Sequence, residues 1–189
     1  MDYQTFLKVF EEIINNETPE PPYTEPQYLK YAKLNFSRMN RWQKTLQLNE
    51  ELVNKVRKID EPQKWIIITE PWCGDGAPIV PFLIGLTEQN PLIQYDLQFR
   101  DQAPFLINSY LTNGTKSIPK LVVRDEAGND LFTYGPRPQA AQQLVNKLKA
   151  SNVDYDTLNT EVQHWYNKDK GNELQKELLQ LFGVGVLSN

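Results

Sequence analysis

The chain has one cysteine, and the residues around it are the part of the sequence best suited to chemistry. Cys73 stands in the segment EPWCGDG, residues 70–76, between an isoleucine-rich apolar run and a stretch of helical periodicity. A helix that starts here presents unpaired backbone N–H groups and the positive end of its dipole to the sulfur. Both favour the thiolate, which is the reactive form, so Cys73 is the candidate catalytic nucleophile.

Three charged residues are expected to set the pKa of this thiol. Asp75 lies two residues after the cysteine and opposes thiolate formation. Arg100 and Arg137 each follow a predicted strand, and parallel strands would bring both to the sheet edge that carries Cys73. There the guanidinium groups would lower the thiol pKa and bind a substrate carboxylate. The alternative is that each arginine pairs with a local acid, such as Asp101 beside Arg100.

The chain begins with two helical regions joined by a proline-rich connector. Apolar residues at helical spacing predict a helix over residues 2–15. Four prolines between residues 18 and 26 exclude regular helix or strand there. Residues 28–59 also show helical periodicity, as one long helix or as two joined near residues 48–49. We therefore expect an N-terminal extension, residues 1–26, ahead of the main domain.

The remaining sequence alternates strands and helices. Residues 65–69 are apolar and mostly β-branched, which is typical of a strand buried on both faces. The further expected elements are a helix at 78–88, a half-exposed strand at 92–99, a short helix at 104–111, a hairpin of 121–123 with 131–134, a helix at 140–148 and a helical tail at 161–182 broken near residue 171. This order predicts an α/β domain with a mixed sheet over residues 27–150, and a tail over 151–189 that packs on it.

Two motifs, taken together, resemble those of thioredoxins. Trp72-Cys73-Gly74 lies at a strand-to-helix turn, and Ser117-Ile118-Pro119 follows about 45 residues later, before the hairpin, where thioredoxins have a cis-proline loop. Over nearly its whole length the chain is similar to a group of bacterial thioredoxin-family proteins of unassigned physiological role. The similar segments are LNFSRM (34–39), WCGD (72–75), YLTNG (110–114), SIPKL (117–121), GPRP (135–138) and WYNKDK (165–170).

This resemblance implies a thioredoxin-like fold, with a central mixed sheet flanked by helices and with N-terminal and C-terminal helical extensions. It also implies a docking groove for an extended peptide or glutathione, formed by Trp72, Ile118 and a cis Pro119. The sequence departs from dithiol thioredoxins at two positions. Gly76 stands where the second cysteine is expected, and Ile67 stands where those enzymes carry a buried acid. The resemblance therefore predicts a monothiol protein.

Three functions fit these observations. In the first, Cys73 attacks a protein or glutathione disulfide, and an external thiol such as glutathione, acting as co-substrate, resolves the mixed disulfide. In the second, the cysteine is an inert remnant, and the protein is a non-enzymatic adaptor that binds peptides in the groove beside Pro119. The third is an iron–sulfur cluster shared by two copies, as in monothiol glutaredoxins, and only Cys73-Gly74 and its spacing support it.

Composition argues against several other classes. The net charge of −4 disfavours a nucleic-acid surface, and no apolar run approaches the length of a membrane-spanning helix. One histidine, His164, and one cysteine disfavour a His/Cys metal site, so a surface or packing role is expected for His164. The single cysteine and the lack of a signal-peptide pattern fit a reducing cytoplasm. We therefore expect a cytoplasmic protein without a metal or a bound cofactor.

Overall fold

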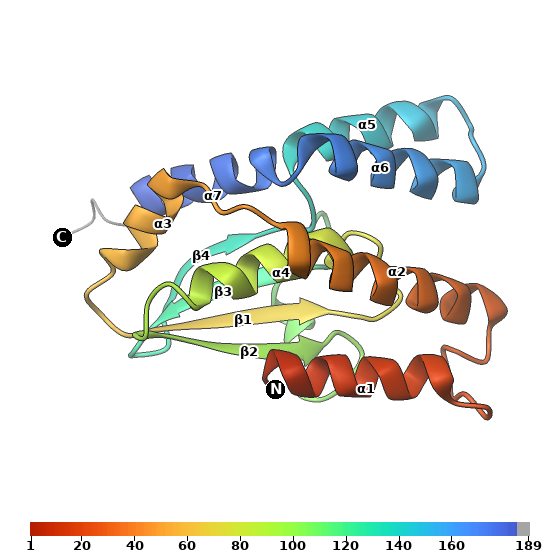
Figure 1. Cartoon of the computed structure of the whole chain (residues 1–189), viewed down its shortest axis with the longest axis horizontal. Coiled ribbons are helices and arrows are strands. Elements are labelled where there is room, and N and C mark those ends of the chain that lie inside the picture. Colours follow the sequence, from red (N-terminus) through yellow and green to blue (C-terminus); the bar gives the residue numbers. More distant parts are fainter. Residues whose placement is uncertain (185–189) are drawn as a thin grey trace.

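The computed structural model describes residues 1–184, and its centre is one four-stranded mixed sheet (Figure 1). The strands are β1 Gln63–Thr69, β2 Ile93–Phe99, β3 Lys120–Asp125 and β4 Asp130–Tyr134, in the spatial order β2-β1-β3-β4. β1 runs parallel to β2 and antiparallel to β3, and β3 pairs antiparallel with β4. The strands β1, β2 and β4 therefore point the same way, which confirms the strand directions expected from the sequence.

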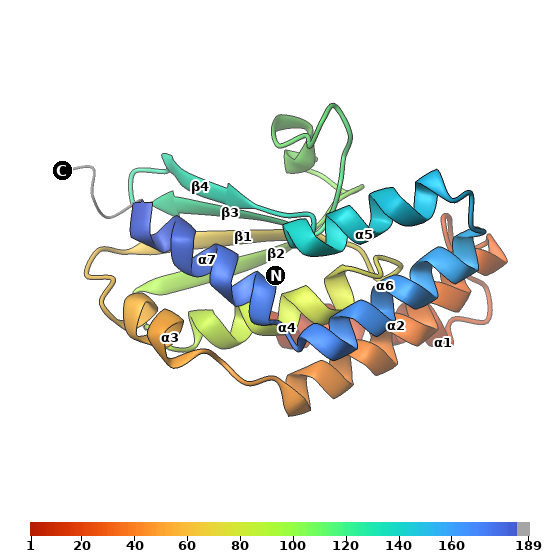
Figure 2. The same ribbon diagram turned by 90° about the horizontal axis from the view of Figure 1, so that it is seen from above.

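Helices flank this sheet. They are α1 Tyr3–Asn15, α2 Pro26–Thr45, α3 Glu50–Arg57, α4 Gly76–Thr87, α5 Gln139–Ala150, α6 Tyr155–Asp169 and α7 Asn172–Val184, with a 3₁₀ turn η1 at Leu106–Ser109. α2 packs on α4, α3 packs on α7, and α5 packs on α6. Seen from above, α1 to α4 lie on one side of the sheet and the loop carrying η1 lies on the other (Figure 2). This is the predicted thioredoxin-like architecture.

The central strand β1 divides the core into two clusters. Trp65 and Ile67 belong to the larger cluster, which the sheet shares with the helices. The smaller cluster, on the side of η1, contains Ile66, Ile68, Cys73, Ile107, Ile118 and Val122. Successive side chains of a strand point to opposite faces, so an apolar run that is buried throughout fits a strand covered on both sides.

The helix that follows the cysteine, α4, is buried on almost every side. All its residues except Gly85 are buried, because the helix lies against the sheet on one side and against α2 on the other. Phe82 contacts Trp42 of α2 with ring centroids 5.9 Å apart. An apolar helix enclosed in this way gives the cysteine loop a rigid base.

Residues 28–59 form two helices, α2 and α3, which is the second of the two arrangements expected from the sequence. Two other regions differ in detail from the sequence-based expectations. Residues 104–111 form only the single turn η1, because Phe105 adopts a left-handed φ of 54° that a continuous helix does not accept. The tail begins its first helix earlier than expected and breaks at Gly171, where φ is +81°. Of the expected tail over 151–189, residues 185–189 lie outside the described part.

The two C-terminal helices contribute to the main core. Five of their apolar side chains are buried, namely Val162, Tyr166, Leu174, Leu178 and Phe182. The Phe182 ring stacks on Trp65 of β1 at 5.6 Å and meets Phe132 of β4 edge-on at 5.0 Å. Burying aromatic area against the central strand stabilises the fold. These helices are therefore structural parts of the domain.

The junction between α6 and α7 offers a test of this packing. A Cβ at Gly171 would lie 2.3 Å from the Phe82 ring, so Gly171→Ala combines a strained backbone with a clash. We expect it to lower the free energy of unfolding by about 2–4 kcal/mol in urea denaturation. Gly128→Ala is the control, because Gly128 also has positive φ (+88°) but open space around it, and should cost about 1 kcal/mol. Equal losses would mean that the contact with Phe82 contributes nothing.

Candidate functional site

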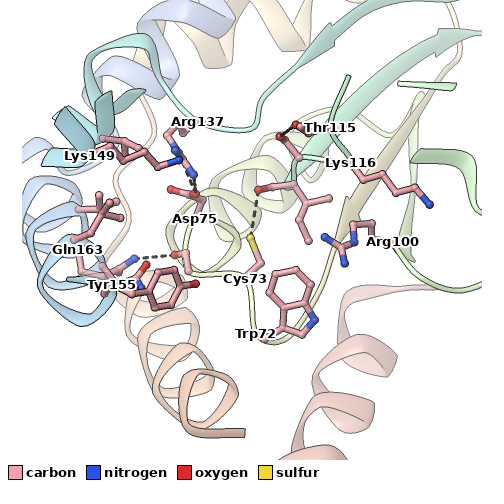
Figure 3. Close-up of a pocket in the computed structure, with 17 residues that line it drawn as sticks. Trp72, Cys73, Asp75, Arg100, Thr115, Lys116, Arg137, Lys149, Tyr155 and Gln163 are labelled. Atoms are coloured by element: carbon pink, nitrogen blue, oxygen red, sulfur yellow. Dashed lines mark hydrogen bonds and ion pairs between the residues drawn. The ribbon is translucent and has the colours of Figure 1, made fainter. Parts of the chain in front are cut away.

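Cys73 lies in the turn between β1 and α4, at the sheet edge where β1, β2 and β4 end (Figure 3). Its backbone N–H donates to the carbonyl of Glu70 at 2.9 Å, which closes the turn. The side chain is 6% exposed, and its Sγ donates to the carbonyl oxygen of Ile118 at 3.4 Å. The thiol therefore bridges the cysteine loop and the loop that precedes β3.

The surroundings of this thiol favour its protonated form. Burial, followed by the negative charge of Asp75, raises the pKa of Cys73 to about 12. The backbone N–H groups of Gly76 and Asp75 and the charge of Arg137 act in the opposite direction but do not outweigh burial. The charge of Arg137 thus lowers the pKa of Cys73, as expected from the sequence, but burial and Asp75 raise it by more. Desolvation disfavours the charged form more than these groups stabilise it.

The carboxylate of Asp75 is the centre of a buried hydrogen-bond network. Asp75 is only 7% exposed. Its Oδ2 accepts hydrogen bonds from Arg137 Nη2 at 2.6 Å and from Arg137 Nε at 3.1 Å. Its Oδ1 accepts from the hydroxyl of Tyr166 at 2.7 Å. Arg137 also donates to Gln142 on α5 at 3.2 Å. Asp75 thus joins the cysteine loop, the β4–α5 connection and α6.

Helix α6 also contacts the backbone of the cysteine loop directly. Gln163 Nε2 donates to the carbonyl of Gly74 at 2.8 Å. Gln163 and Tyr166 were not predicted as site residues, because no sequence pattern ties the tail to Cys73. One signal for a role of the tail was available in the sequence. The segment at 165–170, which contains Tyr166, is similar to the corresponding segment of the bacterial thioredoxin-family group. His164, by contrast, is exposed, and its partner is Glu161 on the same helix at 3.5 Å.

A pocket of about 410 Å³ opens beside the cysteine. It is lined by the predicted site residues Trp72, Cys73, Asp75, Arg100, Ile118 and Arg137, together with Lys116, Lys149 and a wall from α6 (Figure 3). Pro119 is buried behind Ile118 and does not line the pocket; the peptide bond between these two residues is cis. The fold therefore gathers most of the predicted residues at one cavity.

Arg100 lies at the rim of the pocket and pairs with a neighbouring acid. Its Nε and Nη2 donate to the carboxylate of Asp101, as in the local pairing considered as the alternative. Its guanidinium also lies 4.6 Å from the ring centroid of Trp72, a cation–π distance. Trp72 in turn meets the ring of Tyr28 edge-on at 5.3 Å. Arg100 thus covers one face of Trp72 at the pocket rim.

The position that lacks the second cysteine is closely packed. A Cβ at Gly76 would lie 2.5 Å from Thr69 Oγ1 and 3.5 Å from the Cβ of Cys73. The second distance is within the range of disulfide-bonded cysteines, about 3.5–4.5 Å. Thr69 is buried, and its hydroxyl has no hydrogen-bond partner within residues 1–184. Thr69 therefore occupies the space that a resolving cysteine would need.

The family comparison agrees with the architecture. A family model described as thioredoxin matches residues 23–149. Among solved structures, the chain is similar to an HIV epitope scaffold, with 14% identity, a TM-score of 0.49, and coverage of 97% of this chain and 98% of that one. It is also similar to a protein of unknown function from Pseudomonas aeruginosa, with 16% identity, a TM-score of 0.45, and coverage of 94% and 99%. No curated protein gives a significant match.

Within its described residues the chain has neither a metal-binding cluster nor a membrane-spanning helix. Between residues 1 and 184, no group of three or more His, Cys, Asp or Glu side chains is placed to hold a metal ion. Over the same range, no helix is both long and apolar enough to cross a membrane.

The packing at Gly76 predicts the outcome of restoring a second cysteine. Gly76→Cys alone should destabilise the protein, because its Cβ collides with Thr69. Thr69→Ala combined with Gly76→Cys should recover stability and form a disulfide with Cys73 on mild oxidation. Thiol titration in denaturant measures the result, with zero free thiols expected for the oxidised double variant. Two free thiols in a folded double variant would contradict the geometry.

A buried carboxyl at the start of the cysteine loop predicts a pH dependence of stability. Glu70 is 8% exposed and accepts from the backbone N–H of Asp101 at 3.0 Å; burial raises its pKa to about 7. The folded state therefore keeps a proton that the unfolded chain loses above about pH 4.5. This group's contribution to stability falls as pH rises from about 4.5 to 7 and is constant above.

Glu70→Gln removes the charge and keeps an oxygen acceptor. Its free energy of unfolding, relative to wild type, should rise between pH 4.5 and 7.5 by on the order of 2 kcal/mol. Urea denaturation at several pH values measures this difference. Glu126→Gln, in the exposed β3–β4 turn, is the control for a surface carboxyl. A difference for Glu70→Gln that varies with pH no more than that of this control would show that the Glu70 carboxyl is ionised in the folded state.

Proposed function

The chain belongs to the thioredoxin family, and we propose that it acts within this family as a binding module for an extended protein segment. The segment would lie in the pocket between the Trp72–Cys73 turn and the loop before β3. Cys73 would act as a protonated hydrogen-bond donor rather than as a nucleophile. Its role would be to hold the two loops together through Ile118.

The observation that carries this proposal is the state of the thiol. Its Sγ is buried, donates to the carbonyl of Ile118 and has a raised pKa, whereas attack on a disulfide needs a thiolate. The chain has no second cysteine to complete a dithiol cycle, and Thr69 fills the space beside Gly76. These features support binding rather than dithiol exchange.

The loop before β3 supports the mode of binding. Within the described residues, the backbone N–H groups of Lys116, Ser117 and Ile118 donate no hydrogen bond to other backbone groups. These residues also line the pocket. Unpaired backbone donors at the edge of a cavity are suited to pairing with an extended chain, which is how strand addition provides affinity.

A second candidate function is monothiol exchange, and the position of Cys73 in the lining of the pocket favours it. After losing its proton, the thiolate would attack one sulfur of a protein or glutathione disulfide. A mixed disulfide with Cys73 would form, and the other sulfur would leave as a thiolate. An external thiol, such as glutathione as co-substrate, would then attack the mixed disulfide and restore Cys73.

Alkylation of Cys73 distinguishes these functions. Iodoacetamide should modify the folded protein at least about 100-fold more slowly at pH 8 than the same chain in denaturant, where the thiol has its ordinary pKa near 8.5. The rate for the folded protein should keep rising up to pH 10 without a plateau. Mass spectrometry of quenched samples gives both rates from the same preparation.

A conservative variant provides the matched control for binding. Cys73→Ser keeps a hydrogen-bond donor for the carbonyl of Ile118, so it should bind peptides selected on the wild-type protein with affinity within about twofold. A folded-state alkylation rate that levels off below pH 8, together with loss of binding in Cys73→Ser, would overturn the proposal in favour of monothiol exchange.

A further inference from the structure

The lining of the pocket beside Cys73 carries more cations than carboxylates. Among the described residues, it includes the cations Arg100, Lys116, Arg137 and Lys149 but one carboxylate, Asp75. The whole chain, by contrast, has a net charge of −4. A recessed cluster of one sign, surrounded by low-dielectric protein, concentrates the electric field and attracts ligands of the opposite sign. The charge of the pocket is therefore a property of this site and not of the surface in general.

The four cations are not equivalent. Arg137 is bound by Asp75, and Arg100 is bound by Asp101. Lys116 and Lys149 form no ion pair within residues 1–184. They come from different parts of the fold, the loop before β3 and the end of α5, and lie on opposite sides of Cys73 (Figure 3). These two lysines are available to a ligand.

Part of the pocket lining is apolar. Ile118 contributes to it from the loop before β3, and Val145, Leu158 and Val162 contribute from α5 and α6. A pocket that combines an apolar lining with two unpaired cations suits a chain that carries an apolar side chain with negative charges beside it. The wall from α6 limits how wide such a ligand can be.

We propose that the segment bound beside Cys73 is an extended acidic peptide, with Asp or Glu side chains flanking an apolar residue, and that Lys116 and Lys149 select it. This inference rests on the proposed function as a binding module and adds the chemistry of its ligand. The two lysines contribute charge attraction, and the backbone donors of the loop before β3 align the chain.

Selection from a random peptide library tests the inference. Twelve-residue peptides displayed on phage are enriched on the wild-type protein, and their sequences should show an excess of Asp and Glu around an apolar position. Each selected peptide is then synthesised with its acidic residues and with the matching amides. By fluorescence anisotropy at low salt, the amide version should bind about tenfold more weakly.

Variants of the lysines complete the test. Lys116→Gln and Lys149→Gln should each weaken binding of the acidic peptide roughly threefold, and the double variant roughly tenfold, without affecting the amide peptide. Lys147→Gln is the control, because Lys147 lies on the same helix as Lys149, is also exposed and does not line the pocket. Thermal melts confirm that the variants remain folded.

The possible failures are distinguishable. Enriched peptides without acidic residues, whose affinity is unchanged by the lysine variants, would overturn this inference and leave the proposed binding function standing. A library that yields no enriched peptide on the wild-type protein would overturn the binding function and this inference with it.

Discussion

The arrangement of the site depends on one buried carboxylate, that of Asp75. A buried charge is costly unless opposite charge and hydrogen bonds satisfy it, and removing one partner of such a pair is strongly destabilising. Here both oxygens are used, Oδ2 by Arg137 and Oδ1 by Tyr166. The three residues come from the cysteine loop, the β4–α5 connection and α6. Satisfying one charge therefore fixes the relative positions of three chain segments around the pocket.

The same carboxylate restrains the chemistry of the neighbouring thiol. Asp75 lies two residues from Cys73, and its charge adds to burial in raising the pKa of the sulfur. Arg137 would favour a thiolate, but its guanidinium is held on Asp75. The interaction that stabilises the loop thus disfavours the reactive form of the cysteine. A thioredoxin-like helix N-terminus does not by itself make a nucleophile, because the charges and the burial around it decide the outcome.

The sequence predicted the features that depend on local pattern. The apolar run of β1 indicated a strand buried on both faces, and the order of the elements indicated a mixed sheet with three strands in one direction. The contact between Asp75 and Tyr166 joins residues 91 apart, and no periodicity shows such a pairing. The sequence likewise does not show that Thr69 fills the space beside Gly76, because this contact arises only when the chain is folded. The prediction of a short helix at 104–111 was wrong, because the spacing of apolar residues does not reveal the left-handed φ of Phe105.

Helix α6 changes what the sheet edge can bind. It anchors to Gly74 and Asp75 and provides one wall of the pocket. Its first residue, Tyr155, meets the ring of Tyr31 of α2 edge-on at 5.7 Å, and both line a second cavity of about 350 Å³, which shares Trp72 and Tyr155 with the first. The groove expected beside the cysteine is therefore a walled pocket with an aromatic neighbour rather than an open edge. Because walls restrict the width and the chemistry of a ligand, the helix that stabilises the cysteine loop also narrows the range of segments that the site accepts.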